Sequence, residues 1–77
     1  MRTPESESIG RRAAEAIAET AYRVEGISIA AEMENIGVCR QQFYGYEKGA
    51  APDAVILARM AEAGYDVMYI LTGRRST

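Results

Sequence analysis

The sequence contains no histidine and no tryptophan, and it has one cysteine, Cys39. Histidine is the commonest general base in enzymes, so its absence argues against acid–base catalysis. A lone cysteine forms no internal disulfide, and structural zinc sites need clusters of cysteine and histidine. We therefore expect no metal, no cofactor and no enzymatic activity.

Long apolar runs are also missing. No run exceeds five residues, a length that Val67 to Leu71 reaches, whereas a membrane-spanning helix needs roughly 18. The segment from Met1 to Ser8 is polar and acidic, unlike a secretory signal. We expect a cytoplasmic protein with no membrane partner.

Basic charge is scarce in this chain of 77 residues. Nine Lys and Arg stand against eleven Asp and Glu, which gives a formal charge of -2. A chain of this length forms one domain, residues 1–77. The acidic pairs Glu5/Glu7 and Glu32/Glu34 are spaced by two residues, which on a helix directs their side chains to different faces. We interpret these pairs as solvated charge and not as catalytic acids.

Glycine residues divide the chain into pieces of helical length. Each piece has apolar residues at helical spacing, and none alternates as a half-buried strand would. The sequence therefore predicts an all-α fold class, a compact domain of five helices. The glycines that end the helical pieces are Gly26, Gly37, Gly49, Gly64 and Gly73.

The first two helices are predicted from capping residues and apolar spacing. The first begins between Pro4 and Ile9 and ends at Gly26, and the second begins after the cap Ser28 and ends at Gly37. The expected inward stripes are Ile9, Ala13, Ile17, Ala21 and Val24 in the first helix, and Ile29, Met33 and Ile36 in the second.

Three further helices are predicted in the second half of the chain. One runs from Cys39 to about Lys48, and the next has Pro52 at its first position and continues to Gly64. The last helix, about residues 66–71, is capped by Asp66 and is apolar nearly all round, so the core or a second subunit must cover it. The inner face of the fourth helix is expected to be Ile56, Met60 and Ala63, with Val55 and Leu57 beside them.

The second and third helices have the layout of a helix-turn-helix, about residues 28–48, whose second helix enters a DNA major groove. Helical spacing places Val38, Phe43 and Tyr46 on the inner side of the third helix. Arginine can donate bidentately to guanine and glutamine to adenine, which suits base reading. Spacing alone is equally compatible with a polar first turn of an ordinary surface helix. The outer face contains no acid and consists of Arg40, Gln41, Tyr44, Gly45 and Lys48.

Several short segments together resemble one protein family. They are Gly26-Ile27-Ser28, Gly37-Val38-Cys39-Arg40-Gln41, Tyr46-Glu47-Lys48-Gly49, Pro52-Asp53 and Asp66-Val67-Met68-Tyr69-Ile70-Leu71-Thr72-Gly73. Over nearly the whole chain the sequence resembles the lambda-repressor-like, Cro/C1-type helix-turn-helix regulators of bacteriophages and bacteria. The resemblance implies a repressor that binds a two-fold DNA operator as a homodimer in the cytoplasm of a bacterial host, at the nucleoid.

The resemblance also implies roles for individual residues. Arg40, Gln41, Tyr44 and Gly45 are expected to read bases, and Gln42 and Lys48 to lie beside the phosphates. Because the chain is acidic, contacts to the DNA backbone would depend on helix N-termini such as that at Ser28, and on Arg11 and Arg12. Dimerisation is expected to use the last helix, through Tyr65, Val67, Met68, Tyr69 and Leu71.

Three departures from the family pattern support a second hypothesis. Glu32 and Met33 replace an apolar residue and a small one, Cys39 replaces a hydroxyl cap, and the connection through Ala50 and Ala51 is short and uncharged. With the acidic charge, these features suit a phage-encoded module, such as an inhibitor or antirepressor, that keeps the fold and binds a protein partner. That hypothesis predicts that exposed acids, such as Glu32 and Glu34, contact the partner.

Overall fold

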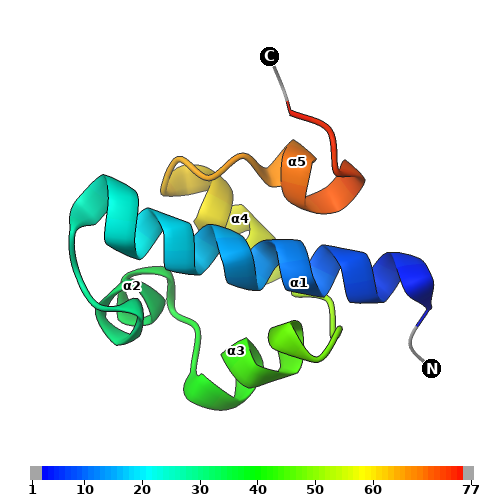
Figure 1. Ribbon diagram of the computed structural model, residues 1–77, viewed down its shortest axis with the longest axis horizontal. Coiled ribbons are helices and arrows are strands. Elements are labelled where there is room, and N and C mark those ends of the chain that lie inside the picture. The colour runs from blue at the N-terminus through cyan, green and yellow to red at the C-terminus, as the bar shows by residue number, and fades with distance from the viewer. Residues whose placement is uncertain (1–2, 76–77) are drawn as a thin grey trace.

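Helices form every regular element of residues 3–75, the part of the chain that the computed structural model describes (Figure 1). Because no strand occurs within these residues, the expected all-α class with five α-helices is confirmed. The first helix continues into a π-helical segment, η1. The elements are α1 (Pro4–Glu19), η1 (Thr20–Glu25), α2 (Ile29–Ile36), α3 (Arg40–Glu47), α4 (Ala54–Glu62) and α5 (Val67–Thr72).

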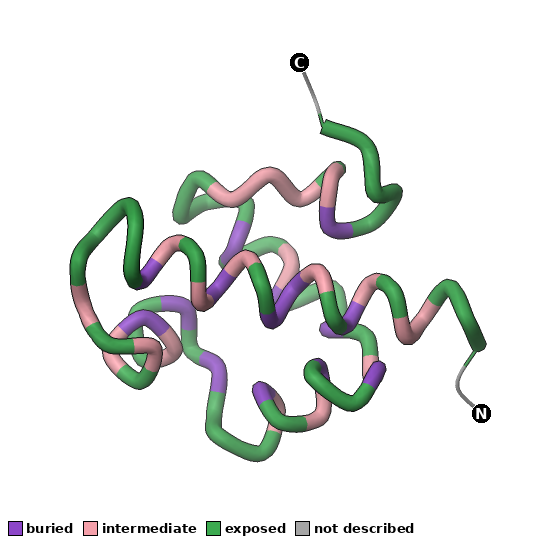
Figure 2. Tube along the Cα trace, viewed as in Figure 1, coloured by how far each residue is buried: buried purple, intermediate pink, exposed green. Residues whose placement is uncertain are grey.

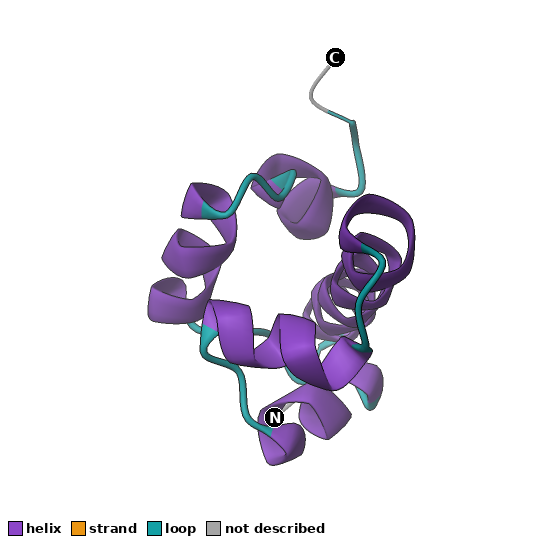
Figure 3. Cartoon of the chain, turned by 90° about the vertical axis from the view of Figure 1, so that its left-hand side faces the viewer, coloured by secondary structure: helices purple, strands orange, loops and turns teal. Residues whose placement is uncertain are grey.

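The long helix α1 crosses the middle of the molecule (Figure 1). Helix α3 lies on one side of α1 and α5 on the other, and short loops join consecutive helices (Figures 1 and 3). Within the described residues, α3 packs only against α1 and α2, and α4 packs only against α2 and α5. Helices α1 and α2 are therefore the nearest helical neighbours of α3.

The core forms where the inner stripes of the helices meet (Figure 2). Ile17, Met60 and Ile70 are completely buried, and Ile36 nearly so. Around them lie buried side chains from α1, the α2–α3 connection, α3 and α4, which are Ala13, Ala14, Val38, Phe43, Tyr46 and Ile56. A core drawn from all five helices means that the position of each helix depends on the others.

Side-chain caps fix where four helices begin, and in α1 the cap is Thr3, whose hydroxyl accepts from the Ser6 N–H at 3.1 Å. The Ser28 hydroxyl accepts from the Ala31 N–H at 3.1 Å, and the Asp66 carboxylate accepts from the Tyr69 N–H at 3.0 Å, which confirms both predicted caps. In α4 the cap is Asp53, which accepts from the Ile56 N–H at 2.9 Å. The prediction that Pro52 is the first residue of this helix is therefore wrong, because Asp53 takes the capping position and the helix begins at Ala54.

The π-helical segment η1 overturns part of the predicted apolar stripe. Ala21 is fully buried, but Val24 is 76% exposed and Tyr22 is also exposed. A π-turn pairs residues five apart, so it is wider than an α-turn and rotates the residues after it out of the α-helical stripe. Val24 and Tyr22 are therefore not core residues. A smaller correction concerns Ala63, which is exposed because it is the C-cap of α4.

Candidate nucleic-acid interface

A connection of three residues joins α2 to α3. Gly37 adopts a left-handed conformation with φ of 73°, which glycine reaches without a steric penalty. The next residue, Val38, is buried, and its N–H donates to the Met33 carbonyl at 2.8 Å. From α4, Arg59 donates to the Gly37 carbonyl at 3.3 Å. These contacts fix the direction in which the chain enters α3.

The start of α3 is held by its own third residue. The side-chain oxygen of Gln42 accepts from the backbone N–H of Cys39 at 2.8 Å, one half of a capping box. This bond satisfies the N–H of the cap residue and uses the amide oxygen of Gln42. Only the amide NH2 group of Gln42 is then left for the phosphate contact that the resemblance implies.

The two faces of α3 divide as predicted. Phe43 and Tyr46 are buried against the core, and burial, with a smaller effect from the charge of Asp53, raises the pKa of the Tyr46 hydroxyl. On the other face Arg40, Gln41 and Tyr44 are exposed. The two buried aromatic side chains therefore hold α3 against the core, while the polar face of α3 remains open to solvent.

Two further predicted residues, Gly45 and Lys48, lie at the end of α3. Gly45 is half-buried, and its carbonyl accepts from the Ala50 N–H at 2.8 Å. A Cβ added at Gly45 would lie 3.6 Å from the Ala50 Cβ, an ordinary contact, so packing does not require glycine there. Lys48 is the exposed C-cap residue of the helix.

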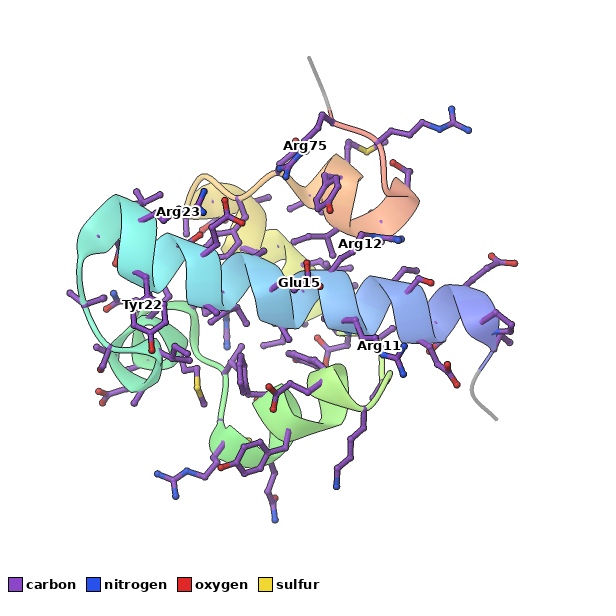
Figure 4. The ribbon with its side chains drawn as sticks, in the orientation of Figure 1. Arg11, Arg12, Glu15, Tyr22, Arg23 and Arg75 are labelled. Carbon is purple, nitrogen blue, oxygen red and sulfur yellow. The ribbon has the colours of Figure 1, made fainter. Side chains whose placement is uncertain are left out.

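Arg11 lies on the same side of the molecule as α3. Its side chain is exposed and points toward α3 (Figure 4). Together with Glu15, Phe43 and Glu47 it lines a shallow groove of about 330 Å³ between α1 and α3. Glu47, the one acid of α3, therefore lies on the flank next to α1. The grooves that Arg40, Gln41 and Tyr44 line are bordered by acids of other segments, Glu34 and Asp53.

The structure removes Arg12 from the predicted DNA-facing set. Its side chain points away from α3, toward α5 (Figure 4). There Nε donates to the Ile70 carbonyl at 2.8 Å and Nη2 to the Leu71 carbonyl at 3.4 Å. A cation at these carbonyls satisfies acceptors at the end of α5 and opposes the negative end of the helix dipole. Arg12 is thus a C-terminal cap for α5.

The predicted dimer residues do not form one exposed surface. Met68 and Leu71 are 56% and 38% exposed and remain available to a partner. Val67 and Tyr65 are partly buried and pack against the core of their own chain, so they offer less surface to a partner than Met68 and Leu71 do. The ring of Tyr69 is half-buried, and the guanidinium of the exposed Arg75 lies over it, 3.9 Å from the ring centroid.

Glu32 is the residue whose environment the sequence predicted least well. It is only 1% exposed, and its carboxylate accepts from the Tyr65 hydroxyl and, at 3.3 Å, from the Asn35 amide. The interpretation of Glu32 as solvated charge, or as an exposed contact for a protein partner, is therefore wrong. One signal was present in the sequence: Glu32 is three residues after Ile29 and four before Ile36, on the inner face of α2.

The remaining features of residues 3–75 suggest no other kind of site. Their helices include none with the length and apolarity needed to cross a membrane, and their acidic and cysteine side chains nowhere gather in threes as metal ligands would. Comparison with protein-family models, with characterised proteins and with solved structures finds no match to this chain.

Proposed function

We propose that this protein is a sequence-specific DNA-binding transcriptional regulator of the lambda-repressor-like, Cro/C1 type, which inserts α3 into the major groove of double-stranded DNA. The observation that carries the proposal is the exposed, acid-free face formed by Arg40, Gln41 and Tyr44 on a helix that follows α2 after three residues. A short pair of helices with the second one presented outward is the layout of a helix-turn-helix.

The side chains on this face suit base reading in the major groove. Arg40 and Gln41 lie in the first turn of α3, the part of a recognition helix that commonly reaches base edges. Arginine donates two hydrogen bonds to guanine and glutamine pairs with adenine. Tyr44, one turn later, offers a ring edge and a hydroxyl, and the missing side chain at Gly45 permits close approach to the DNA.

Contacts to the DNA backbone would be few in this proposal. Arg11, Lys48 and the amide of Gln42 flank α3, and the N-terminus of α2 at Ser28 offers backbone N–H groups. Each neutralised phosphate contributes about 0.9 to the slope of log affinity against log salt concentration. A chain with net charge -2 should therefore show a shallow slope and weak binding to non-specific DNA.

A homodimer completes the proposal. Two copies that meet through Met68 and Leu71 would present two α3 helices to an operator with two-fold symmetry, with half-sites about 10 base pairs apart. Binding over a promoter would repress transcription by excluding the polymerase.

The first test is base reading. We expect one fragment in a pool of labelled DNAs, including DNA around the coding locus, to bind more tightly than the rest in fluorescence anisotropy titrations. Gln41→Ala and Arg40→Ala should each reduce that preference about tenfold, because each removes a bidentate contact. Glu62→Ala, at an exposed position on α4, is the matched control and should leave the preference unchanged. Equal, weak binding of all fragments would refute the proposal and favour a protein partner instead.

A second test compares two neighbouring arginines. Arg11→Gln should reduce the salt slope by about one phosphate contact, because Arg11 points toward α3 (Figure 4). Arg12→Gln removes the same charge one residue away and should leave the salt slope unchanged, while it lowers the melting temperature by loss of the α5 cap. Equal effects of both variants on the slope would contradict the assignment of Arg11 to the DNA side.

A further inference from the structure

Two carboxyl groups meet at the junction between η1 and α2. The Asn35 amide nitrogen lies 3.4 Å from Glu25 Oε2 and 3.3 Å from Glu32 Oε1, so one amide donor bridges both groups. The second oxygen of Glu32 accepts from the Tyr65 hydroxyl. The hydrogen-bond donors to the buried Glu32 carboxylate are thus a phenol and an amide, neither of which carries positive charge, and the shared amide holds the Glu25 carboxyl beside it.

Within residues 3–75, the arginines of η1 and α4 contact other groups. From η1, Arg23 lies 3.8 Å from Glu19, and from α4, Arg59 donates to the Gly37 carbonyl. On α2 the next acid, Glu34, is exposed, and from the α4–α5 connection only Tyr65 reaches Glu32. Burial, then the bond to Glu32, raises the pKa of Tyr65, so this hydroxyl stays protonated and remains a donor.

Like charges in contact disfavour joint ionisation, so such a pair binds a proton more readily than either acid alone. The hydrogen bond to Glu32 raises the pKa of Glu25 above its ordinary 4.5; desolvation and the charge of Glu32 act in the same direction, and Asn35 opposes them. The two carboxyl groups belong to the end of η1 and to α2, two elements that the connection Gly26–Ser28 joins.

We propose that Glu25 and Glu32 share one proton, and that this proton fastens the end of η1 to α2 as a pH-sensitive regulator of the DNA-facing helix. Helix α3 packs only against α1 and α2 within the described residues, so a looser α2 leaves α3 less firmly held. Loss of the proton places two negative charges side by side, and the exposed Glu25 is the partner free to move away. The DNA part of this inference rests on the proposed function.

The sign of the pH effect follows from the direction of the shift. An acid with a raised pKa in the folded state stabilises the fold fully below its unfolded pKa, and the stabilisation is lost as the pH rises through the folded value. The bond between Glu25 and Glu32 is therefore complete at pH values below the ordinary glutamate pKa and is lost as the pH rises through the raised pKa of Glu25. Glu25→Gln replaces the proton with an amide donor that persists at every pH.

The first arm of the experiment measures stability alone. We expect the melting temperature of Glu25→Gln to approach that of the wild type below pH 4.5 and to exceed it by about 2–4 °C at pH 7. Glu34→Gln removes one charge from an exposed position of α2, and its difference from the wild type should be the same at both pH values. Parallel curves for Glu25→Gln and Glu34→Gln would overturn the shared proton.

The second arm measures affinity for the tightest-binding DNA fragment at constant ionic strength. Glu25→Gln should bind about threefold more tightly than the wild type at pH 7, and the ratio of the two affinities should be smaller at pH 5. An equal ratio at both pH values overturns the link between the proton and α3. Absence of any preferred fragment, with the melting result intact, overturns the DNA function and leaves the proton site standing. A preferred fragment together with parallel melting curves overturns the proton site and leaves the DNA function standing.

Discussion

Replacement of Gly10 with alanine is expected to destabilise the fold by about 3 kcal/mol, a fall in melting temperature of roughly 10–20 °C. A Cβ at this position would lie 2.4 Å from the Ala50 carbonyl oxygen and 2.9 Å from the Tyr46 carbonyl oxygen. Both obstacles are backbone atoms, so no side-chain rotation relieves the overlap. Helix α1 would have to separate from the segment that follows α3.

A matched control for this variant exists in α3. Gly45→Ala also places a methyl group on a helix, but its Cβ would meet only the Ala50 Cβ at 3.6 Å. The gain in helix propensity should leave Gly45→Ala as stable as the wild type, or more stable by up to about 1 kcal/mol. Thermal denaturation of both variants checks the argument, and a Gly10→Ala protein that melts with the wild type would disprove the close approach of α1.

The functional consequence of Gly10→Ala follows from the same contact. Because α3 has only α1 and α2 as neighbours, a shift of α1 moves the proposed reading helix. Gly10 is therefore important for the DNA-facing surface even though it lies on α1.

Local chemistry predicted much of this fold from the sequence. Ser28 and Asp66 were identified as caps because their side chains accept from a backbone N–H three residues later, a short-range contact. The inner positions Phe43 and Tyr46 followed from helical spacing. Such features depend on residues within one or two turns of each other, which a single sequence displays directly.

Two of the features that the sequence did not predict depend on contacts between distant segments. The pairing of Arg12 with the α5 carbonyls spans 58 residues. The burial of Glu32 depends on Tyr65, 33 residues away. The exposure of Val24, in contrast, depends on a local π-turn that no motif in the segment Thr20–Glu25 indicates. Charge alone indicated exposed positions for Arg12 and Glu32. The partner of each residue is brought beside it only when the helices pack together.

Removal of the Tyr65 hydroxyl gives the last prediction. Tyr65→Phe is expected to destabilise the fold by about 2–3 kcal/mol, because the buried carboxylate of Glu32 loses a hydrogen-bond donor and water does not replace it. The phenyl ring keeps its packing against the core, so the change reports the hydroxyl and not a cavity.

A double-mutant cycle tests whether the cost of Tyr65→Phe comes from its hydrogen bond to Glu32. In a Glu32→Leu background the carboxylate that needs a donor is gone, and Tyr65→Phe should then cost less than about 0.5 kcal/mol, because both partners have become apolar. Urea denaturation of the four proteins at pH 7 gives the coupling energy directly. Equal costs of Tyr65→Phe in both backgrounds would mean that the hydroxyl stabilises the protein by some route other than Glu32. A large coupling would instead establish that a single hydrogen bond joins the segment before α5 to α2, and through α2 to the helix proposed to read DNA.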